Sequence, residues 1–292
     1  MRMRFGPAGN SQKFYEEGYK SSEQAPEWIA AQGLNAYEYA AGHGVSLGET
    51  LARKIGAKAA QVDVAVSIHS PYYINCAAVD EQKRANTFRY FLESARAVSW
   101  MGGRRVVFHP GSSGKLPRSE AVQRVLHTYL EIRSYLDEQG YEEIILCPET
   151  MGRVGQLGTL DEVLALCEAD ERALPTLDFG HLHTVGLGAL NCEEDFYSVL
   201  QTLVSRLGFE RVKHFHAHFS RIEFGPKGEK QHRCFYEQDF GPDFTHLAPV
   251  LVEMGLEPTI ICESAGTQAP DAQFMRDQIA LEKEKRFIPS TV

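Results

Sequence analysis

The chain has 292 residues, of which 43% are hydrophobic and 24% are charged, and its formal net charge at pH 7 is −9. This balance excludes a disordered chain, a collagen-like repeat and a coiled coil. The negative charge also argues against a protein that holds nucleic acid through a broad basic face, although bound metal ions can supply positive charge at a local site.

Short apolar runs recur about eight times along the chain, and an amphipathic stretch follows each of them. Several runs are β-branched and do not alternate with polar residues, as expected of strands that are buried on both faces. The strands that we predict from these runs are Arg2–Phe5, Ala36–Tyr39, Ala65–His69, Arg105–His109, Ile144–Glu149, Leu174–Asp178, Val212–His216 and Thr259–Glu263.

The segments between these strands carry helix signals. Gly140 and Gly255 are helix-ending residues, and Thr159 with Glu162 forms a capping box at a helix start. The helices that we predict are Asp80–Trp100, Ser119–Gln139, Thr159–Glu168 and Asp243–Met254.

Strand and helix alternate about every 30 residues, which predicts a parallel sheet. About eight such units close a (β/α)₈ TIM barrel, and no Pro-rich or Ser-rich linker divides the chain, so we expect one barrel domain over residues 1–292. A doubly wound open sheet is the alternative. It would need fewer units, and no G-x-G-x-x-G follows a strand.

The informative residues stand where the predicted strands end. In a barrel these ends meet at one mouth, where active sites lie. The side chains there are the nitrogen and oxygen ligands that bind zinc and similar ions: His69, His109, Glu149, Asp178 with His181 and His183, His214 with His216 and His218, and Glu263. A single histidine at such a place is more often a hydrogen-bonded core residue, but several buried carboxylates need compensating charge, which cations would supply.

The ligands are more numerous than one zinc ion needs, since zinc takes about four. The set that would fill one site is Glu149, Asp178, His216 and Glu263. His69 and His109 would then bind a second ion that shares Glu149, and His181 with His232 could hold a third. Two or more neighbouring ions suit phosphoryl-oxygen chemistry, in which one activates water and another stabilises the leaving oxygen.

Several motifs together resemble endonuclease IV, the zinc-dependent apurinic/apyrimidinic endonuclease family with a xylose-isomerase-like barrel. His69-Ser-Pro-Tyr-Tyr-Ile-Asn75 resembles the family's H-x-P-Y-aliphatic-aliphatic-N, and Asp178-Phe-Gly-His181 resembles its D-T-C-H. Glu149 with MGRVGQLGT, the segment from His216, and Cys262-Glu263-Ser resemble further family motifs in the same order.

The resemblance implies hydrolysis of the phosphodiester 5′ to an abasic site in double-stranded DNA, by a hydroxide that bridges metal ions. It implies two to three zinc ions, with manganese as the alternative at carboxylate-rich sites. The implied ligands are His69, His109, Glu149, Asp178, His181, His216, His232 and Glu263. Glu149 and Glu263 would be the catalytic carboxylates, and Tyr72 and Tyr73 would contact DNA, Tyr73 being equally readable as a barrel-rim aromatic.

Two segments depart from that family. Where its third metal site has Asp-x-His, this chain has Lys230-Gln231-His232, so either Glu229 substitutes for the aspartate or the third site is weaker or absent. The segment after the second strand reads YEYAAGHGVS and matches the family's basic DNA-contacting loop poorly, which leaves the mode of DNA binding open.

A sugar isomerase or epimerase of the same barrel superfamily is the rival interpretation. Such an enzyme uses one divalent ion, for which Glu149, Asp178, His216 and Glu263 would suffice, with Glu149 and Glu263 as the acid/base pair. The extra ligands His69, His109 and His181 favour the nuclease.

The six cysteines are scattered and form no C-x-x-C pair, and no apolar run approaches the ~18 residues that span a bilayer. We therefore expect a reduced, cytoplasmic protein with mostly buried thiols, no membrane partner and no obligate protein partner.

Overall fold

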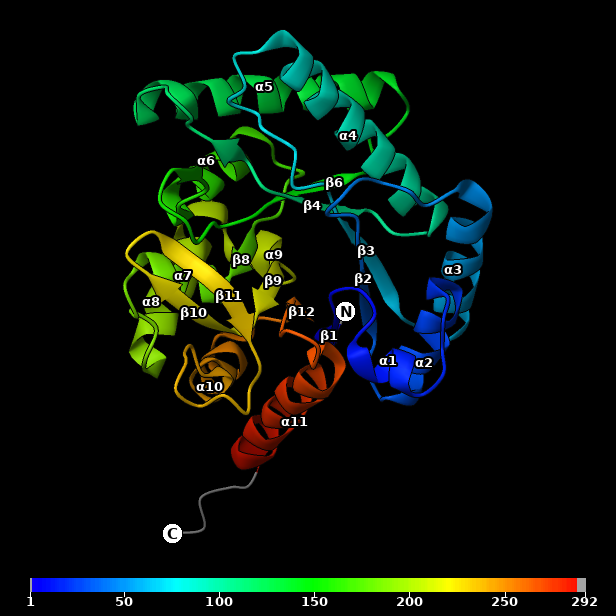
Figure 1. Ribbon diagram of the computed structural model, residues 1–292. Helices are drawn as coiled ribbons and strands as arrows, with labels where there is room; N and C mark the ends of the chain where they lie inside the picture. Colours follow the sequence, from blue (N-terminus) through cyan, green and yellow to red (C-terminus); the bar gives the residue numbers. More distant parts are fainter. Residues whose placement is uncertain (1, 288–292) are drawn as a thin grey trace.

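The computed structural model describes residues 2–287. Within them, two four-stranded parallel sheets run in the orders β1-β12-β9-β8 and β2-β3-β4-β6. Parallel bridges from Ala8 to Glu38 and from Glu149 to Thr176 join the sheets at both edges. The predicted TIM barrel is therefore confirmed (Figure 1). Its strands are β1 (Arg4–Pro7), β2 (Ala36–Ala40), β3 (Ala65–His69), β4 (Arg105–Phe108), β6 (Ile145–Pro148), β8 (Thr176–Asp178), β9 (His216–Phe219) and β12 (Thr259–Cys262).

Helices surround the strands in Figure 1, and α11 closes the ring beside β1 and β12. The capping box at the start of α6 is confirmed, because Thr159 Oγ1 accepts from the Glu162 amide and Glu162 Oε2 accepts from the Thr159 amide. The helices are α1 (Gln12–Glu16), the 3₁₀ turn η1 (Ser22–Gln24), α2 (Ala25–Ala31), α3 (Glu49–Gln61), α4 (Glu81–Trp100), α5 (Arg118–Glu138), α6 (Leu160–Ala169), α7 (Phe179–Val185), α8 (Glu193–Leu207), α9 (Phe209–Val212), α10 (Phe244–Met254) and α11 (Gln268–Phe287).

Two antiparallel strand pairs extend the loops at the carboxyl ends of the barrel strands. One joins β5 (Gly111–Ser112), in the loop after β4, to β7 (Gln156–Leu157), in the loop after β6, and the other is a hairpin of β10 (Arg221–Gly225) and β11 (Gly228–Arg233). The tip of the hairpin is tied to the loop after β6, since the amide of Glu229 donates to the Gly152 carbonyl over 3.0 Å. No sequence signal had predicted this hairpin.

The seventh predicted strand, Val212–His216, is wrong. Residues 209–212 form the short helix α9, and the strand β9 begins at His216 and ends at Phe219. The apolar side chains of Val212 and Phe215 are buried as expected, but Val212 is the last residue of the helix and Phe215 lies in the turn that follows it. The shift moves the carboxyl end of the strand from His216 to Phe219.

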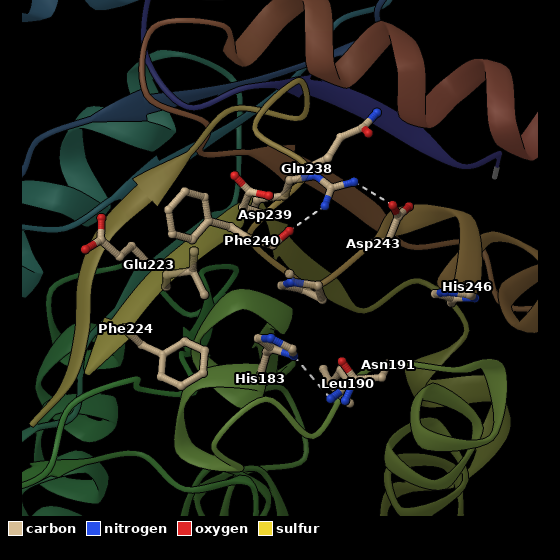
Figure 2. A pocket seen from close by; sticks show the side chains of 14 residues that line it. His183, Leu190, Asn191, Glu223, Phe224, Gln238, Asp239, Phe240, Asp243 and His246 are labelled. Carbon is tan, nitrogen blue, oxygen red and sulfur yellow. Dashed lines mark hydrogen bonds and ion pairs between the residues drawn. The ribbon is translucent and has the colours of Figure 1, made fainter. Parts of the chain in front are cut away.

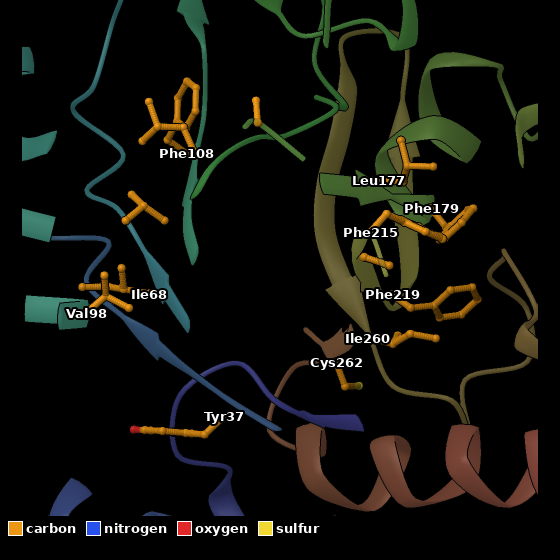
Figure 3. Packing of buried hydrophobic residues seen from close by; sticks show 14 of the residues in the cluster. Tyr37, Ile68, Val98, Phe108, Leu177, Phe179, Phe215, Phe219, Ile260 and Cys262 are labelled. Atoms are coloured by element: carbon orange, nitrogen blue, oxygen red, sulfur yellow. The ribbon is translucent and has the colours of Figure 1, made fainter. Parts of the chain in front are cut away.

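Successive strand residues face two different environments. Ile68, Phe108 and Phe219 point outward into the apolar layer between strands and helices, where Val98 of α4 packs beside Ile68 (Figure 3). Their neighbours along the strands point into the barrel and include buried polar side chains such as Ser67 and His218. The outer layer thus supplies the hydrophobic stabilisation, and the interior is left for a polar centre.

All six cysteines are free thiols, and each is buried except Cys192, which agrees with the expectation of mostly buried thiols. Over residues 2–287, no helix combines the length and the apolar character that a bilayer crossing requires.

Candidate metal centre

Glu149 occupies the middle of the barrel mouth, directly after β6, and is 1% exposed. Its Oε2 lies 3.1 Å from His69 Nε2 and 3.2 Å from His109 Nε2. Its Oε1 lies 3.3 Å from His218 Nδ1. The two carboxylate oxygens therefore face two different groups of side chains, which is the arrangement of a bridging ligand.

The group around Oε1 gathers ligands from three neighbouring strands. Asp178 ends β8, His218 lies in β9 and Glu263 follows β12. One ligand atom from each of these residues and from Glu149 lies within 4.8 Å of the others. His218 Nδ1 is 3.5 Å from Glu263 Oε2, so both side chains point at the same spot.

A third group lies beside the first two and includes the hairpin β10–β11. His181 Nε2, in the first turn of α7, is 3.3 Å from Glu229 Oε2, and His232 Nε2 is 3.8 Å from Glu229 Oε1. Glu229 thus lies beside His181 and His232, as the alternative in which it substitutes for the aspartate requires. The absence of a side chain at Gly152 leaves room for the His181 ring, because a Cβ at residue 152 would lie 2.7 Å from that ring.

Two histidines of these groups use one ring nitrogen to bind the backbone, and the other ring nitrogen faces the centre. His69 Nδ1 lies 2.8 Å from the Ser70 carbonyl and His181 Nδ1 lies 2.8 Å from the Thr150 carbonyl. Since a carbonyl only accepts, both Nδ1 atoms carry hydrogen, and in the neutral imidazoles the Nε2 lone pairs face the centre. Such outer bonds orient metal-ligating histidines and set their tautomers.

His218 follows the same pattern through a residue that the sequence analysis missed. Its Nε2 donates to Glu38 Oε1 over 2.8 Å, which leaves Nδ1 facing Glu149. Glu38 lies inside β2, is fully buried and also accepts from Ser67 Oγ over 2.8 Å. The sequence does contain a sign of this role. Glu38 is the single charged residue in the strand AYEYA, and a buried carboxylate needs a positively charged or hydrogen-bonding partner.

The position of His216 differs from the expectation. It begins β9, one layer below the mouth, and its Nε2 lies 3.0 Å from Glu38 Oε2 without the alignment of a hydrogen bond. His218, two residues later on the same face of the strand, takes the place that was assigned to His216 beside Glu149, Asp178 and Glu263. The misplaced seventh strand is the reason. His183, also at a predicted strand end, lies away from the clusters.

The other predicted residues come together at the mouth. The centre lies at the floor of a cavity of about 450 Å³, and the side chains that line it include His69, His109, Glu149, His181, Glu229, His232, Glu263 and Tyr72. The Tyr72 ring stacks on the His109 ring with centroids 5.3 Å apart. Tyr73 points to the neighbouring cavity, and its side chain is 58% exposed.

The electrostatics of the centre favour positive charge. Burial by itself lowers the pKa of His218, but the carboxylates of Glu263, Glu38 and Glu149 outweigh that effect and hold this pKa well above its usual range. Burial raises the pKa of Glu263, and the nearby carboxylates of Glu149 and Asp178 act in the same direction. The negative potential that retains a proton on an imidazole also attracts a metal cation.

One buried atom tests whether these residues fit a metal. Asp178 Oδ1 accepts from the His181 amide at the start of α7, over 2.7 Å. Asp178 Oδ2 is buried without any hydrogen-bond partner among the described residues, and Asp178 belongs to the group with His218 and Glu263. An unsatisfied buried carboxylate oxygen is costly, and a cation held by these side chains would satisfy it. The residues therefore fit one or more divalent ions.

A different cavity, of about 500 Å³, lies between α7, β10 and the loop 238–243 (Figure 2). His183 faces it and accepts a 3.2 Å hydrogen bond from the Leu190 amide through Nδ1. Three carboxylates line it: Glu223, Asp239 and Asp243. It contains none of the grouped metal ligands described above.

Comparison with protein families decides the family. Residues 26–284 match the family described as xylose isomerase-like TIM barrel. The chain belongs to this family. A relative from Methanocaldococcus jannaschii, an uncharacterized protein, is 32% identical over 231 residues, which is 79% of this chain and 82% of that protein. The family resemblance noted in the sequence is thereby confirmed.

The proteins that resemble this chain carry two kinds of name. A probable endonuclease 4 of Mycoplasma pneumoniae is 29% identical over 171 residues. The match spans 56% of this chain and 56% of that relative, so it covers only about half of each protein. Endonuclease IV from Thermus thermophilus superposes with a TM-score of 0.69 at 20% identity, covering 96% of this chain and 100% of the other. A D-tagatose 3-epimerase-like protein superposes with a TM-score of 0.70 at 20% identity, covering 97% and 100%. At such identities these two structures show a common fold alone.

Proposed function

We propose that this protein is a metal-dependent phosphodiesterase of the endonuclease IV type, which cleaves DNA on the 5′ side of an abasic site. The single observation that supports this most strongly is the division of Glu149, whose Oε2 faces His69 and His109 while its Oε1 faces His218. One carboxylate between two ligand groups suits two neighbouring ions, and paired ions are the usual device for in-line displacement at phosphorus.

The ligands are assigned to three positions in this proposal. His69, His109 and Glu149 hold one ion, and Glu149, Asp178, His218 and Glu263 hold the second. His181, Glu229 and His232 hold a third. We propose zinc because imidazole contributes to every group, with manganese as the alternative at the carboxylate-rich second position. Such ions, when bound, neutralise charge on the phosphate, activate water and stabilise the leaving oxygen.

The protein's own groups carry the proton and the substrate. Glu263 borders the cavity with 16% of its side chain exposed, so its carboxylate is placed to take a proton from the attacking water. The water oxygen bonds to phosphorus, the bond from phosphorus to the 3′ oxygen breaks, and that oxygen leaves as a hydroxyl by taking the proton that Glu263 removed from the water. Glu149 orients the ligands on its two sides through its contacts with His69, His109 and His218, and Tyr72 lines the cavity wall.

A one-ion sugar epimerase is the second candidate, because epimerase-like structures share the fold. Glu149, Asp178, His218 and Glu263 would hold its ion, and Glu149 with Glu263 would exchange protons with the sugar. That function leaves the contacts of His69 and His109 with Glu149 without a role, and the same is true of the group around Glu229. We therefore rank it second.

The test is incision of a labelled duplex that carries one tetrahydrofuran abasic analogue, by protein loaded with zinc or manganese. We expect a single nick that leaves a 3′-hydroxyl, and we expect Glu149→Gln to abolish it. Glu143→Gln is the matched control, since Glu143 is 72% exposed and pairs only with Arg104 among the described residues. Failure of the loaded protein to nick the duplex, together with turnover of a ketose, would establish the epimerase instead.

A further inference from the structure

A second cavity, which we name the α4 cavity, opens beside the metal centre. It has a volume of about 500 Å³ and is bordered by Lys83 and Tyr90 of α4 and by Tyr73 and Asn75 of the loop after β3. Tyr72, His109 and Gln156 line both this cavity and the one above the metal ligands. The two cavities are therefore adjacent, and a substrate that reacts at the metal centre can extend over these three side chains into the α4 cavity.

The α4 cavity differs in charge from its neighbours. Among the described residues no carboxylate lines it, although the chain has 39 acidic and 30 basic residues. Three glutamates line the cavity above the metal ligands, and three carboxylates line the one in Figure 2. Lys83 forms no ion pair within residues 2–287. A free ammonium group in a wall without carboxylates favours an anionic ligand.

The same wall offers flat aromatic surface and hydrogen-bond donors. The rings of Tyr73 and Tyr90 have centroids 6.1 Å apart and are tilted by 39°. Asn75 Oδ1 already accepts from the amides of Ala77 and Ser112, so the remaining polar group of this side chain is its NH₂, a donor. Aromatic rings beside a cation and neutral donors are the features that bind a base and its phosphate.

We propose that the α4 cavity is a nucleotide subsite, which holds a nucleotide adjacent to the phosphodiester that reacts at the metal centre. Lys83 contacts the phosphate, and Tyr73 with Tyr90 packs against the base. This inference rests on the proposed function, and it makes the substrate class an oligonucleotide rather than a free sugar. A monosaccharide that reacts at one ion has no flanking anion for Lys83 to bind.

The experiment measures by anisotropy, at several salt concentrations, the dissociation constant of the metal-loaded protein for a fluorescent abasic duplex whose reacting phosphodiester is replaced by a non-hydrolysable analogue. We expect Lys83→Gln to weaken binding about fivefold and to reduce the slope of log Kd against log salt by about one, because one phosphate contact is lost. Lys283→Gln is the matched control, an exposed lysine near the end of α11 that should change neither quantity.

The tyrosines give an independent readout. Tyr73→Ala should raise Kd by at least about fivefold and leave the salt slope unchanged, because stacking is not an ionic contact. Tyr90→Ala, which removes the ring, should weaken binding. Tyr90→Phe keeps the ring and should bind as tightly as the wild type, which would assign the loss in Tyr90→Ala to the missing ring. Thermal unfolding of every variant confirms that it is folded.

Separate outcomes overturn the subsite and the proposed function. If the wild-type protein nicks the abasic duplex but Lys83→Gln and Tyr73→Ala bind the non-hydrolysable duplex as tightly as the wild type does, the subsite is wrong and the nuclease stands. If the wild-type protein neither nicks nor binds the duplex and turns over a ketose with Lys83→Gln unimpaired, the proposed function fails and the subsite fails with it.

Discussion

Glu38 Oε1 lies 2.8 Å from His218 Nε2, inside the barrel and out of contact with solvent. Burial by itself would raise the pKa of Glu38, but the imidazoles of His218 and His216 outweigh that effect and hold it well below its usual range. An ionised carboxylate only accepts, so His218 must present the hydrogen on Nε2 to it. The nitrogen that faces Glu149 is then the one with a lone pair whenever the imidazole is neutral.

We expect Glu38→Gln to weaken metal binding about ten- to hundredfold without loss of the fold, because the amide no longer accepts from both sides and His218 loses its fixed tautomer. Competition between the protein and a chelator for zinc measures the change. Glu142→Gln, an exposed substitution, is the control. Unchanged zinc affinity in Glu38→Gln, with the fold intact, would show that the contact is structural only.

The two histidines of β9 should differ in their effect on metal content. We expect His218→Gln to reduce the number of tightly bound zinc ions per chain, because His218 Nδ1 faces Glu149 and Glu263. His216→Gln should keep that number, since His216 contacts Glu38 rather than the mouth. Elemental analysis after gel filtration gives the counts. The opposite pattern would mean that the mouth is built from His216.

Removal of metal should destabilise the folded state. The buried carboxylates of Glu149, Asp178 and Glu263 lie close together, and the groups that offset the charge of Glu149 and Glu263 are imidazoles. We expect a chelator to lower the temperature of thermal unfolding and added zinc to restore it. Zinc at 100 times its Kd would contribute about 2.7 kcal/mol of stability. Equal unfolding temperatures with and without chelator would contradict metal binding in the folded state.

Glu162 at the start of α6 should make stability depend on pH. Partial burial opposes its ionisation, but hydrogen bonds from Arg118 and from the amides of Gly158 and Thr159 outweigh that and lower its pKa. Since the folded state favours the ionised form, its stabilising contribution is present above the pKa of the unfolded chain and disappears as the pH falls through the folded-state pKa.

Glu162→Gln therefore should lower the free energy of unfolding by about 1 kcal/mol at neutral pH and by less in acid. Urea unfolding at two pH values measures both differences. If the free energies of unfolding of the variant and the wild type differ by the same amount at both pH values, the effect comes from side-chain packing and not from the charge of Glu162. Glu171→Gln, an exposed site with no hydrogen bond of its own among the described residues, is the control.

Much of the barrel was predictable because its signals are local. A strand such as Ala65–His69 is an unbroken apolar run, and its bounds agree with the structure. The capping box of Thr159 and Glu162 spans four residues and was equally readable. The side chains that directly follow such runs, His109, Glu149 and Glu263, were predictable at one cavity for the same reason, since parallel strands bring their ends to one mouth.

The remaining features depend on contacts between distant segments. Whether His216 or His218 reaches the mouth is set by where β9 begins against β8 and β12. The sequence HFHAHF alternates histidine with apolar residues, so it fits a strand in either position and does not reveal a shift of two residues. Glu38 and Glu229 acquire their partners only when β2 faces β9 across the barrel and the hairpin β10–β11 folds onto the loop after β6. Local patterns specify which side chains can bind a cation, whereas long-range packing selects which of them point at the same ion.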